Sequence, residues 1–160
     1  MNVRERLKHV PQRGRVEWIG LAPAKHAPLV PVERARVEIG TGFEAEHHSA
    51  TGEGQRQVTL IQAEHFPVIG SLLGREVGPA DTRRNVVVSG INLASLKEQR
   101  FRIGDVLLEY SRDCPPCGRM EEVLGEGGFQ AMRGHGGICA SVLEAGYLAV
   151  GDAVVVVPAE

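Results

Sequence analysis

Two cysteines three positions apart, Cys114 and Cys117, are the clearest chemical feature of the chain. Prolines occupy both positions between them, so this segment is stiff. A cysteine is a nucleophile or a soft-metal ligand only as a thiolate, and neighbouring cations favour that form. Arg112 and Arg119 flank the pair. The spacing alone is compatible with a redox pair, half of a metal site, one reactive thiolate, or two cysteines that pack as small hydrophobic residues.

A second candidate site is the sequence Arg83-Arg84-Asn85, which leads into a run of valines. The guanidinium group matches the geometry of phosphate oxygens, and an asparagine amide adds both a donor and an acceptor. These residue types favour an anion-binding site at the start of a buried strand. The same pattern is compatible with a solvated pair of charges followed by an asparagine turn.

Histidines form a third group of candidates. In the segment 134–137 the glycines around His135 allow backbone amides to approach a ligand closely, although flexible loops have the same composition. His47 and His48 are adjacent and lack the spacing of metal ligands. His65 falls on an expected short helix, where a structural role and a catalytic role are both open.

Many short elements must position these residues, because the chain has 20 glycines and 9 prolines. Alternating or β-branched patterns predict strands, and Pro67 is expected to break the first of two helices. Residues 91–96 are compatible with one or two helical turns or with a loop. The expected strands cover 16–20, 36–39, 57–61, 85–89, 101–108, 140–143 and 147–155, the helices 62–73 and 119–124, and a glycine-rich loop 125–137. About seven strands separated by turns predict a mainly β barrel or sandwich.

Two segments resemble each other, each with a Gly-Asp pair between an aromatic-aliphatic stretch and a strand-forming run. The pairs are Gly104-Asp105 and Gly151-Asp152. Glycine at the first position of a two-residue loop suits a type II′ turn, so we expect tight hairpins or strand entries at both places.

Length and charge limit the classes of partner. The chain has 160 residues and a mass of 17.3 kDa, which is one domain of ordinary size. Its net charge of −2 gives no overall electrostatic case for nucleic acid or an anionic membrane. No segment reaches the ~20 apolar residues of a membrane helix. Three cysteines do not suggest a secreted disulfide framework, so we expect the reducing cytoplasm.

Taken in order along the chain, these motifs resemble the molybdenum cofactor sulfurase C-terminal (MOSC) domain family over roughly residues 15–157. No single motif is specific, but the ordered set of motifs, with a cysteine at the right distance after Arg-Arg-Asn, is hard to obtain by chance. The motifs are Gly40-x-Gly42 with His48, residues 55–62, residues 83–93, residues 101–106, Pro116-Cys117-Gly118, and Gly146 through Gly151-Asp152 to Val154.

The resemblance implies a MOSC-type β-barrel with a few short helices and long loops, in a single stand-alone domain spanning residues 1–160. It implies that Cys117 is the hallmark cysteine, which either ligates molybdenum or carries and transfers sulfur. Arg83, Arg84 and Asn85 match the motif beside the cofactor pocket, and His48 is the one histidine that carries over. The implied cofactor is molybdopterin-bound molybdenum, which would support reduction of N-hydroxylated compounds. The implied partners are a sulfur donor such as a cysteine desulfurase, or a redox protein.

Two further hypotheses come from other classes of protein. The first is a small structural zinc module with Cys114, Cys117, His135 and Cys139 as ligands, since the Cys-x-x-Cys spacing suits zinc. The second is a non-catalytic binding module in which Cys117 is simply packed. The metal and pterin content of the purified protein distinguishes these two hypotheses from the molybdenum-cofactor hypothesis.

Overall fold

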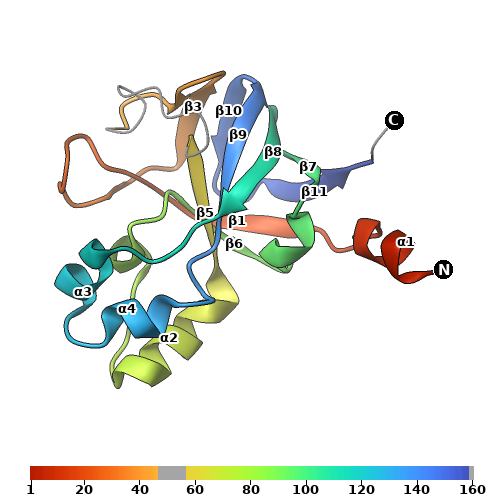
Figure 1. Cartoon of the computed structure of the whole chain (residues 1–160). Coiled ribbons are helices and arrows are strands. Elements are labelled where there is room, and N and C mark those ends of the chain that lie inside the picture. Colours follow the sequence, from red (N-terminus) through yellow and green to blue (C-terminus); the bar gives the residue numbers. More distant parts are fainter. Residues whose placement is uncertain (47–56, 159–160) are drawn as a thin grey trace.

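A computed structural model describes residues 1–46 and 57–158 (Figure 1). The strands are β1 (Gly14–Leu21), β2 (Val30–Pro31), β3 (Arg34–Glu38), β4 (Gly42–Phe43), β5 (Val58–Gln62), β6 (Val86–Ser89), β7 (Arg100–Ile103), β8 (Val106–Asp113), β9 (Ile138–Glu144), β10 (Gly146–Ala149) and β11 (Ala153–Val157). The α-helices are α1 (Val3–Lys8), α2 (Phe66–Leu73), α3 (Gly118–Leu124) and α4 (Gly128–Met132), and the 3-10 helices are η2 (Ala63–His65), η3 (Pro79–Thr82) and η4 (Leu93–Leu96).

Seven of the described strands form a closed barrel. Their order is β11-β7-β8-β9-β5-β6-β1, and pairing of β1 with β11 closes the ring, while β2 extends β1 outside it. The chain is therefore mainly β with a barrel and short helices, as the sequence predicted. Closure leaves no open sheet edge within the ring, which removes a site for unwanted strand pairing.

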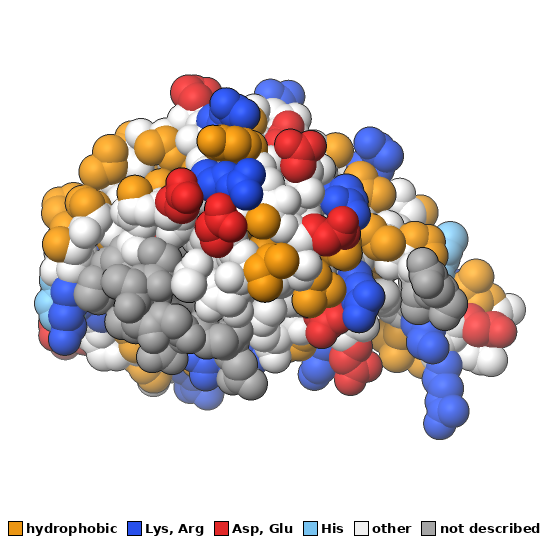
Figure 2. Space-filling view, turned by 90° about the horizontal axis from the view of Figure 1, so that it is seen from above, with side chains coloured by type: hydrophobic (Ala, Val, Ile, Leu, Met, Phe, Trp, Pro, Cys, Tyr) orange, Lys and Arg blue, Asp and Glu red, His pale blue; other side chains and the backbone are white. Residues whose placement is uncertain are grey.

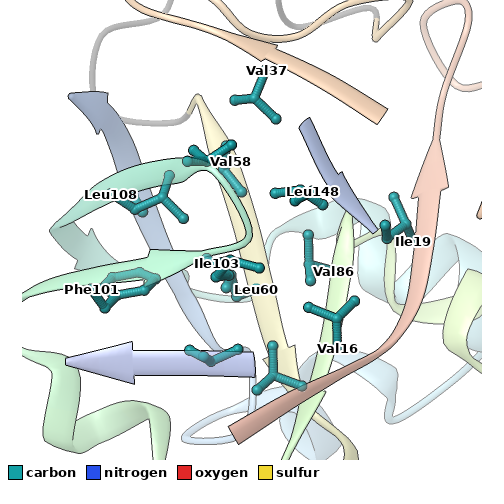
Figure 3. Close-up of a cluster of buried hydrophobic side chains, with 14 of the residues drawn as sticks. Val16, Ile19, Val37, Val58, Leu60, Val86, Phe101, Ile103, Leu108 and Leu148 are labelled. Atoms are coloured by element: carbon teal, nitrogen blue, oxygen red, sulfur yellow. The ribbon is translucent and has the colours of Figure 1, made fainter. Parts of the chain in front are cut away.

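The barrel interior is filled by aliphatic side chains from strands on all sides (Figure 3). Val16, Leu60, Val86, Phe101 and Ile103 have no exposed surface. Each such side chain contributes roughly 1.5–3 kcal/mol through burial, relative to an exposed position. In β7 the period-two pattern corresponds to an inward and an outward face, whereas β5 and β6 are buried on both faces.

A three-stranded sheet of β10, β3 and β4 lies at the end of the barrel that is at the top of Figure 1. Leu148 of β10 and Val37 of β3 join the barrel core (Figure 3). The two Gly-Asp turns consequently differ. Gly104-Asp105 makes a tight hairpin between β7 and β8, whereas Gly151-Asp152 is a strand entry that leads the chain from this sheet into the barrel.

Among the described strands, β5 and β6 are the one parallel pair. Parallel neighbours need a long crossover, and here the crossover carries η2, α2 and η3. Pro67 lies in the first turn of α2, so the expected helix 62–73 is divided into η2 and α2 as predicted. Parallel pairing also places the first residues of β5 and β6 at the same end of these two strands.

Helices α2, α3 and α4 gather at one end of the molecule (Figure 1). They cover a second apolar cluster on the outer side of β5 and β6, which includes Ile61, Ile69, Met120 and Met132. Helix α4 was not expected, because residues 125–137 read as a glycine-rich loop. The carboxylate of Glu121 explains it, since it accepts hydrogen bonds from backbone N–H groups at the start of α4.

Other differences from the sequence expectations are small. No helix or strand was expected before residue 16, but α1 forms there behind a capping box made by Asn2 and Glu5. Residues 93–96 form η4, one of the two alternatives left open. On the face seen in Figure 2, basic and acidic side chains are interspersed, as the near-zero net charge suggests. Within residues 1–46 and 57–158, no helix has the length and apolar character needed to cross a membrane.

Candidate functional site

Cys117 is exposed and lies immediately before α3, in an extended conformation with φ −125° and ψ 172°. It lines a cavity of about 190 Å³. Residues from the loop after β1, from the segment before β6 and from α3 also line the cavity. Its described lining is Ala22, Ala24, Lys25, His26, Leu29, Glu46, Thr59, Arg83, Arg84, Asn85, Cys117, Arg119 and Met120. The two sequence candidates, the cysteine and the Arg-Arg-Asn motif, therefore meet.

Arg83 is the half-buried arginine of the motif. Its backbone is left-handed, with φ 61°, which a residue other than glycine adopts at a cost. Its guanidinium donates a hydrogen bond to the carbonyl of Ala27. Burial lowers the pKa of Arg83, the charge of Arg119 lowers it further, and Glu46 and Cys117 act in the opposite direction. Arg119, Glu46 and Cys117 are thus close enough to Arg83 to act on its charge.

Arg84 is almost completely buried, with 1% of its surface exposed. Its guanidinium donates to the carbonyls of Gly136 (2.8 Å), Thr82 (3.2 Å), Pro115 (3.3 Å) and Cys114 (3.5 Å). Four hydrogen bonds leave little of its donor capacity for a ligand, because an arginine carries five N–H groups. Its side chain lines the cavity, but its bonds fix the cysteine-bearing segment against the loop before β9.

Asn85 is buried at the same edge and links three segments. Its amide oxygen accepts from the Thr59 hydroxyl at 3.0 Å, and its backbone N–H donates back to that hydroxyl at 2.9 Å. Its amide nitrogen donates to the Gly20 carbonyl and to a Glu46 carboxylate oxygen, both at 3.1 Å. The parallel pairing of β5 and β6 creates this contact, since Thr59 and Asn85 lie near the starts of those strands.

Glu46 is a site residue that sequence reasoning missed. It is 4% exposed, and its carboxylate accepts from the backbone N–H of Ala22 at 2.6 Å as well as from Asn85. The sequence shows only a polar loop there, in which Glu44 looks the same as Glu46. The signal that would have pointed to Glu46 is Asn85. An asparagine at the start of a buried strand has amide N–H groups that need acceptors, and a carboxylate is one such acceptor.

Cations outnumber carboxylates in the cavity. The charged side chains of its described lining are Lys25, Arg83, Arg84, Arg119 and Glu46. Arg119 pairs with Glu122 at 2.6 Å, while its Nε is buried without a hydrogen-bond partner among the described residues. A cavity with this balance of charge favours an anionic occupant. Of the two arginines that flank the cysteines in sequence, Arg119 lines the cavity, whereas Arg112 is exposed on β8.

The other described candidates, Cys114, His135 and Cys139, do not line this cavity. His48 is outside the described residues. Cys114 and Cys139 are buried, and the ring of His135 packs edge-on against His65, with centroids 5.2 Å apart. Within the described residues, no group of three or more His, Cys, Asp or Glu side chains is placed to hold a metal ion. The zinc module of Cys114, Cys117, His135 and Cys139 is therefore wrong, because the four side chains do not converge.

The chain is thus a small protein with a closed β-barrel, and an exposed thiol and arginines line one cavity at one end of its strands. The MOSC domain model matches residues 45–155, and the chain belongs to the MOSC family. No match was found among the curated proteins.

Solved structures share the fold at low identity. The YuaD protein from Bacillus subtilis is 20% identical with a TM-score of 0.82, and the match covers 95% of this chain and 100% of that one. YiiM from Geobacillus stearothermophilus is 17% identical with a TM-score of 0.75, over 90% of this chain and 75% of that one. YiiM from Escherichia coli is 17% identical with a TM-score of 0.70, over 91% and 71%.

Proposed function

We propose that this MOSC protein binds a molybdenum cofactor, with Cys117 as the thiolate ligand of the metal. One observation carries the proposal: the exposed Cys117 shares a cavity with Arg83 and Arg119, and the family motif leads into that cavity. A thiolate suits a soft or high-valent metal, and arginines suit the phosphate and oxygen-rich end of a pterin cofactor.

The residues present fit such a group in charge and in donor type. The excess of cations in the cavity, and the unpartnered Nε of Arg119 among the described residues, both favour an anionic occupant. At about 190 Å³ the cavity is smaller than the roughly 300–1,000 Å³ of common small-molecule sites. It therefore suits one end of a cofactor better than a whole cofactor.

The side chains divide into two roles. Cys117, Arg83 and Arg119 are the groups that would contact the cofactor. Arg84 and Asn85 would mainly hold neighbouring segments in place, since most of their hydrogen-bonding groups already bond to protein atoms. When bound, the cofactor would supply two-electron redox chemistry, such as reduction of N-hydroxylated compounds with electrons from a partner protein. The chain's own contribution is to hold the thiolate and to neutralise the anionic end.

Anaerobic purification followed by molybdenum and pterin analysis tests this proposal. We expect retained cofactor in the wild-type protein and loss in Cys117→Ser, with an unchanged circular dichroism spectrum. Cys114→Ala is the matched control, because Cys114 is buried three positions away and faces a different cavity. Equal cofactor retention in Cys117→Ser and the wild-type protein would overturn the ligand assignment.

The exposure of Cys117 favours sulfur transfer as the second candidate function. In that reaction the Cys117 thiolate attacks the outer sulfur of a donor persulfide, such as that of a cysteine desulfurase. A new S–S bond forms at Cys117, and the donor leaves as a thiolate, so no external oxidant is needed. Mass spectrometry after incubation with a desulfurase and cysteine should show one added sulfur on Cys117 and none in Cys117→Ser.

A further inference from the structure

A second cavity, of about 370 Å³, lies on the other side of the segment that carries the two prolines. Asp113, Cys114, Pro115 and Pro116 line it, whereas the next residue, Cys117, lines the first cavity. No described residue lines both. The segment 113–116 therefore acts as a wall between two separate sites, and the second one has no role in the function proposed above.

Two side-chain amides that line this cavity already use their oxygen atoms as hydrogen-bond acceptors. The Gln62 side-chain oxygen accepts from the backbone N–H of Leu93 at 3.0 Å, and the Asn92 oxygen accepts from Ala94 at 3.1 Å. An amide whose oxygen is used in this way has its NH₂ group left to offer. Gln62 and Asn92 consequently contribute hydrogen-bond donors to the cavity lining.

His65 adds a third donor. Its Nδ1 is buried and has no hydrogen-bond partner among the described residues. An unpaired buried N–H is rarer in proteins than an unpaired acceptor, so we assign the ring proton to Nε2. Burial and the neighbouring His135 lower the pKa of His65, which keeps the ring neutral at pH 7. The neutral ring then donates through Nε2 and has no free acceptor there.

The remaining lining is one exposed cation, one carboxylate and an apolar surface. Arg133 lies in the exposed part of the lining, and its guanidinium contacts Gln130 at 3.1 Å. Asp113 is the one carboxylate of the described lining, and an oxygen of it accepts from the Tyr110 hydroxyl at 2.8 Å. The apolar part of the lining is Leu93, Ala94, Pro115, Pro116 and Ile138.

We propose that this second cavity binds a small organic monocarboxylate, whose carboxylate meets Gln62, His65, Asn92 and Arg133 while its apolar body lies on the proline wall. A set of donors selects an acceptor-rich head group, and a carboxylate accepts hydrogen bonds more strongly than a neutral carbonyl does. The volume lies within the range of small-molecule sites. This site is additional to the cofactor site and does not depend on it.

Benzoate is the probe, and ¹H–¹⁵N correlation spectra of the full chain are the measurement. We expect saturable shifts at Leu93, Ala94 and residues 133–138. Benzamide has the same shape without the charge, and it should bind at least about 10-fold more weakly. Equal binding of benzamide and benzoate, or benzoate shifts confined to the Cys117 cavity, would overturn the proposal.

Gln62→Glu is the sharpest variant, because it keeps the acceptor for the Leu93 N–H and replaces the free donor with a negative charge. It should weaken benzoate binding by more than about 10-fold, and Arg133→Gln by about 5-fold. Cys117→Ser is the matched control and should bind benzoate normally. Unchanged binding in Gln62→Glu, or lost binding in Cys117→Ser, would refute a separate site. If benzoate does not bind, the molybdenum proposal is unaffected. If the chain holds no molybdenum cofactor, the carboxylate proposal is likewise unaffected.

Discussion

The barrel interior and the end of the barrel that faces Cys117 are built in different ways. The interior contains aliphatic and aromatic side chains such as Leu60 and Phe101, with no exposed surface. The cysteine end buries polar groups instead, among them Arg84, Asn85 and Glu46, and joins them by hydrogen bonds between distant segments. An apolar interior depends on volume, whereas a buried polar network depends on each partner being present.

The difference predicts two kinds of response to substitution. A truncation inside the barrel should lower the free energy of unfolding and leave the chemistry of Cys117 alone. A truncation in the polar network should cost less stability but change how the cysteine segment is held. Moving outward from the interior, the effect on stability should fall while the effect on the site rises.

The largest effect on stability is expected from Phe101→Ala. Phe101 has no exposed surface and packs in the main core, so the substitution removes buried apolar area and leaves a cavity. The free energy of unfolding should fall by about 3–5 kcal/mol, measured by urea denaturation. Alkylation of Cys117 in the folded protein should proceed at the wild-type rate. A loss below ~1 kcal/mol would mean that the interior is less well packed than described.

Asn85→Ala should come next, at about 2–4 kcal/mol, because it leaves the Thr59 hydroxyl, the Gly20 carbonyl and Glu46 each short of a partner. Asn92→Ala is the matched control. Its exposed side chain caps a 3-10 helix, so its loss should cost only about 1 kcal/mol. Equal losses in the two variants would contradict a special role for the buried network.

Arg84→Met should cost about 1–3 kcal/mol, since four carbonyls lose a donor while a buried charge is also removed. Its larger effect should be on Cys117, whose alkylation rate should change with the position of the wall. Arg84→Lys should restore the wild-type alkylation rate only in part, because an ammonium group cannot reproduce the hydrogen bonds of the planar guanidinium. A wild-type alkylation rate in Arg84→Met would show that the wall holds its place without the guanidinium.

The smallest expected effect is a pH dependence from His65. Its pKa in the folded protein is lowered from 6.5 by burial and by His135. As the pH falls below 6.5, the unfolded chain takes up a proton that the folded protein resists, so the free energy of unfolding decreases. The decrease ends once the pH passes the lowered value. Thermal denaturation between pH 7.5 and 5 should show a shallower slope for His65→Gln, and identical slopes would contradict this.

The sequence predicted most of the barrel, for a physical reason. Strands with one inward face show alternation, as in residues 100–103, and those buried on both faces show β-branched runs, as in residues 86–88. In residues 16–20 a β-bulge between Val16 and Trp18 shifts the alternation, so Ile19 rather than Trp18 joins the barrel core. Helix α4 was missed because its start is stabilised by Glu121, a partner from the preceding helix rather than from its own segment.

The candidate site was predicted in part. Arg83, Arg84, Asn85 and Cys117 do line one cavity. The adjacent arginines look alike in sequence, yet one is half-buried beside the thiol and the other bonds to four carbonyls. Only the three-dimensional arrangement of partners separates them. Glu46 was missed for the same reason, since its partners come from β1 and from the start of β6.

The paired prolines carry one more consequence. Neither Pro115 nor Pro116 has an amide hydrogen, so this stretch can be anchored to the protein backbone only through its carbonyl oxygens. Arg84 takes the oxygen of Pro115 and that of the preceding cysteine. The Cys114 backbone N–H, which donates to the Gly137 carbonyl at 2.9 Å, holds only the start of this stretch. Loss of the Arg84 guanidinium would therefore leave the Pro115 carbonyl without its anchor.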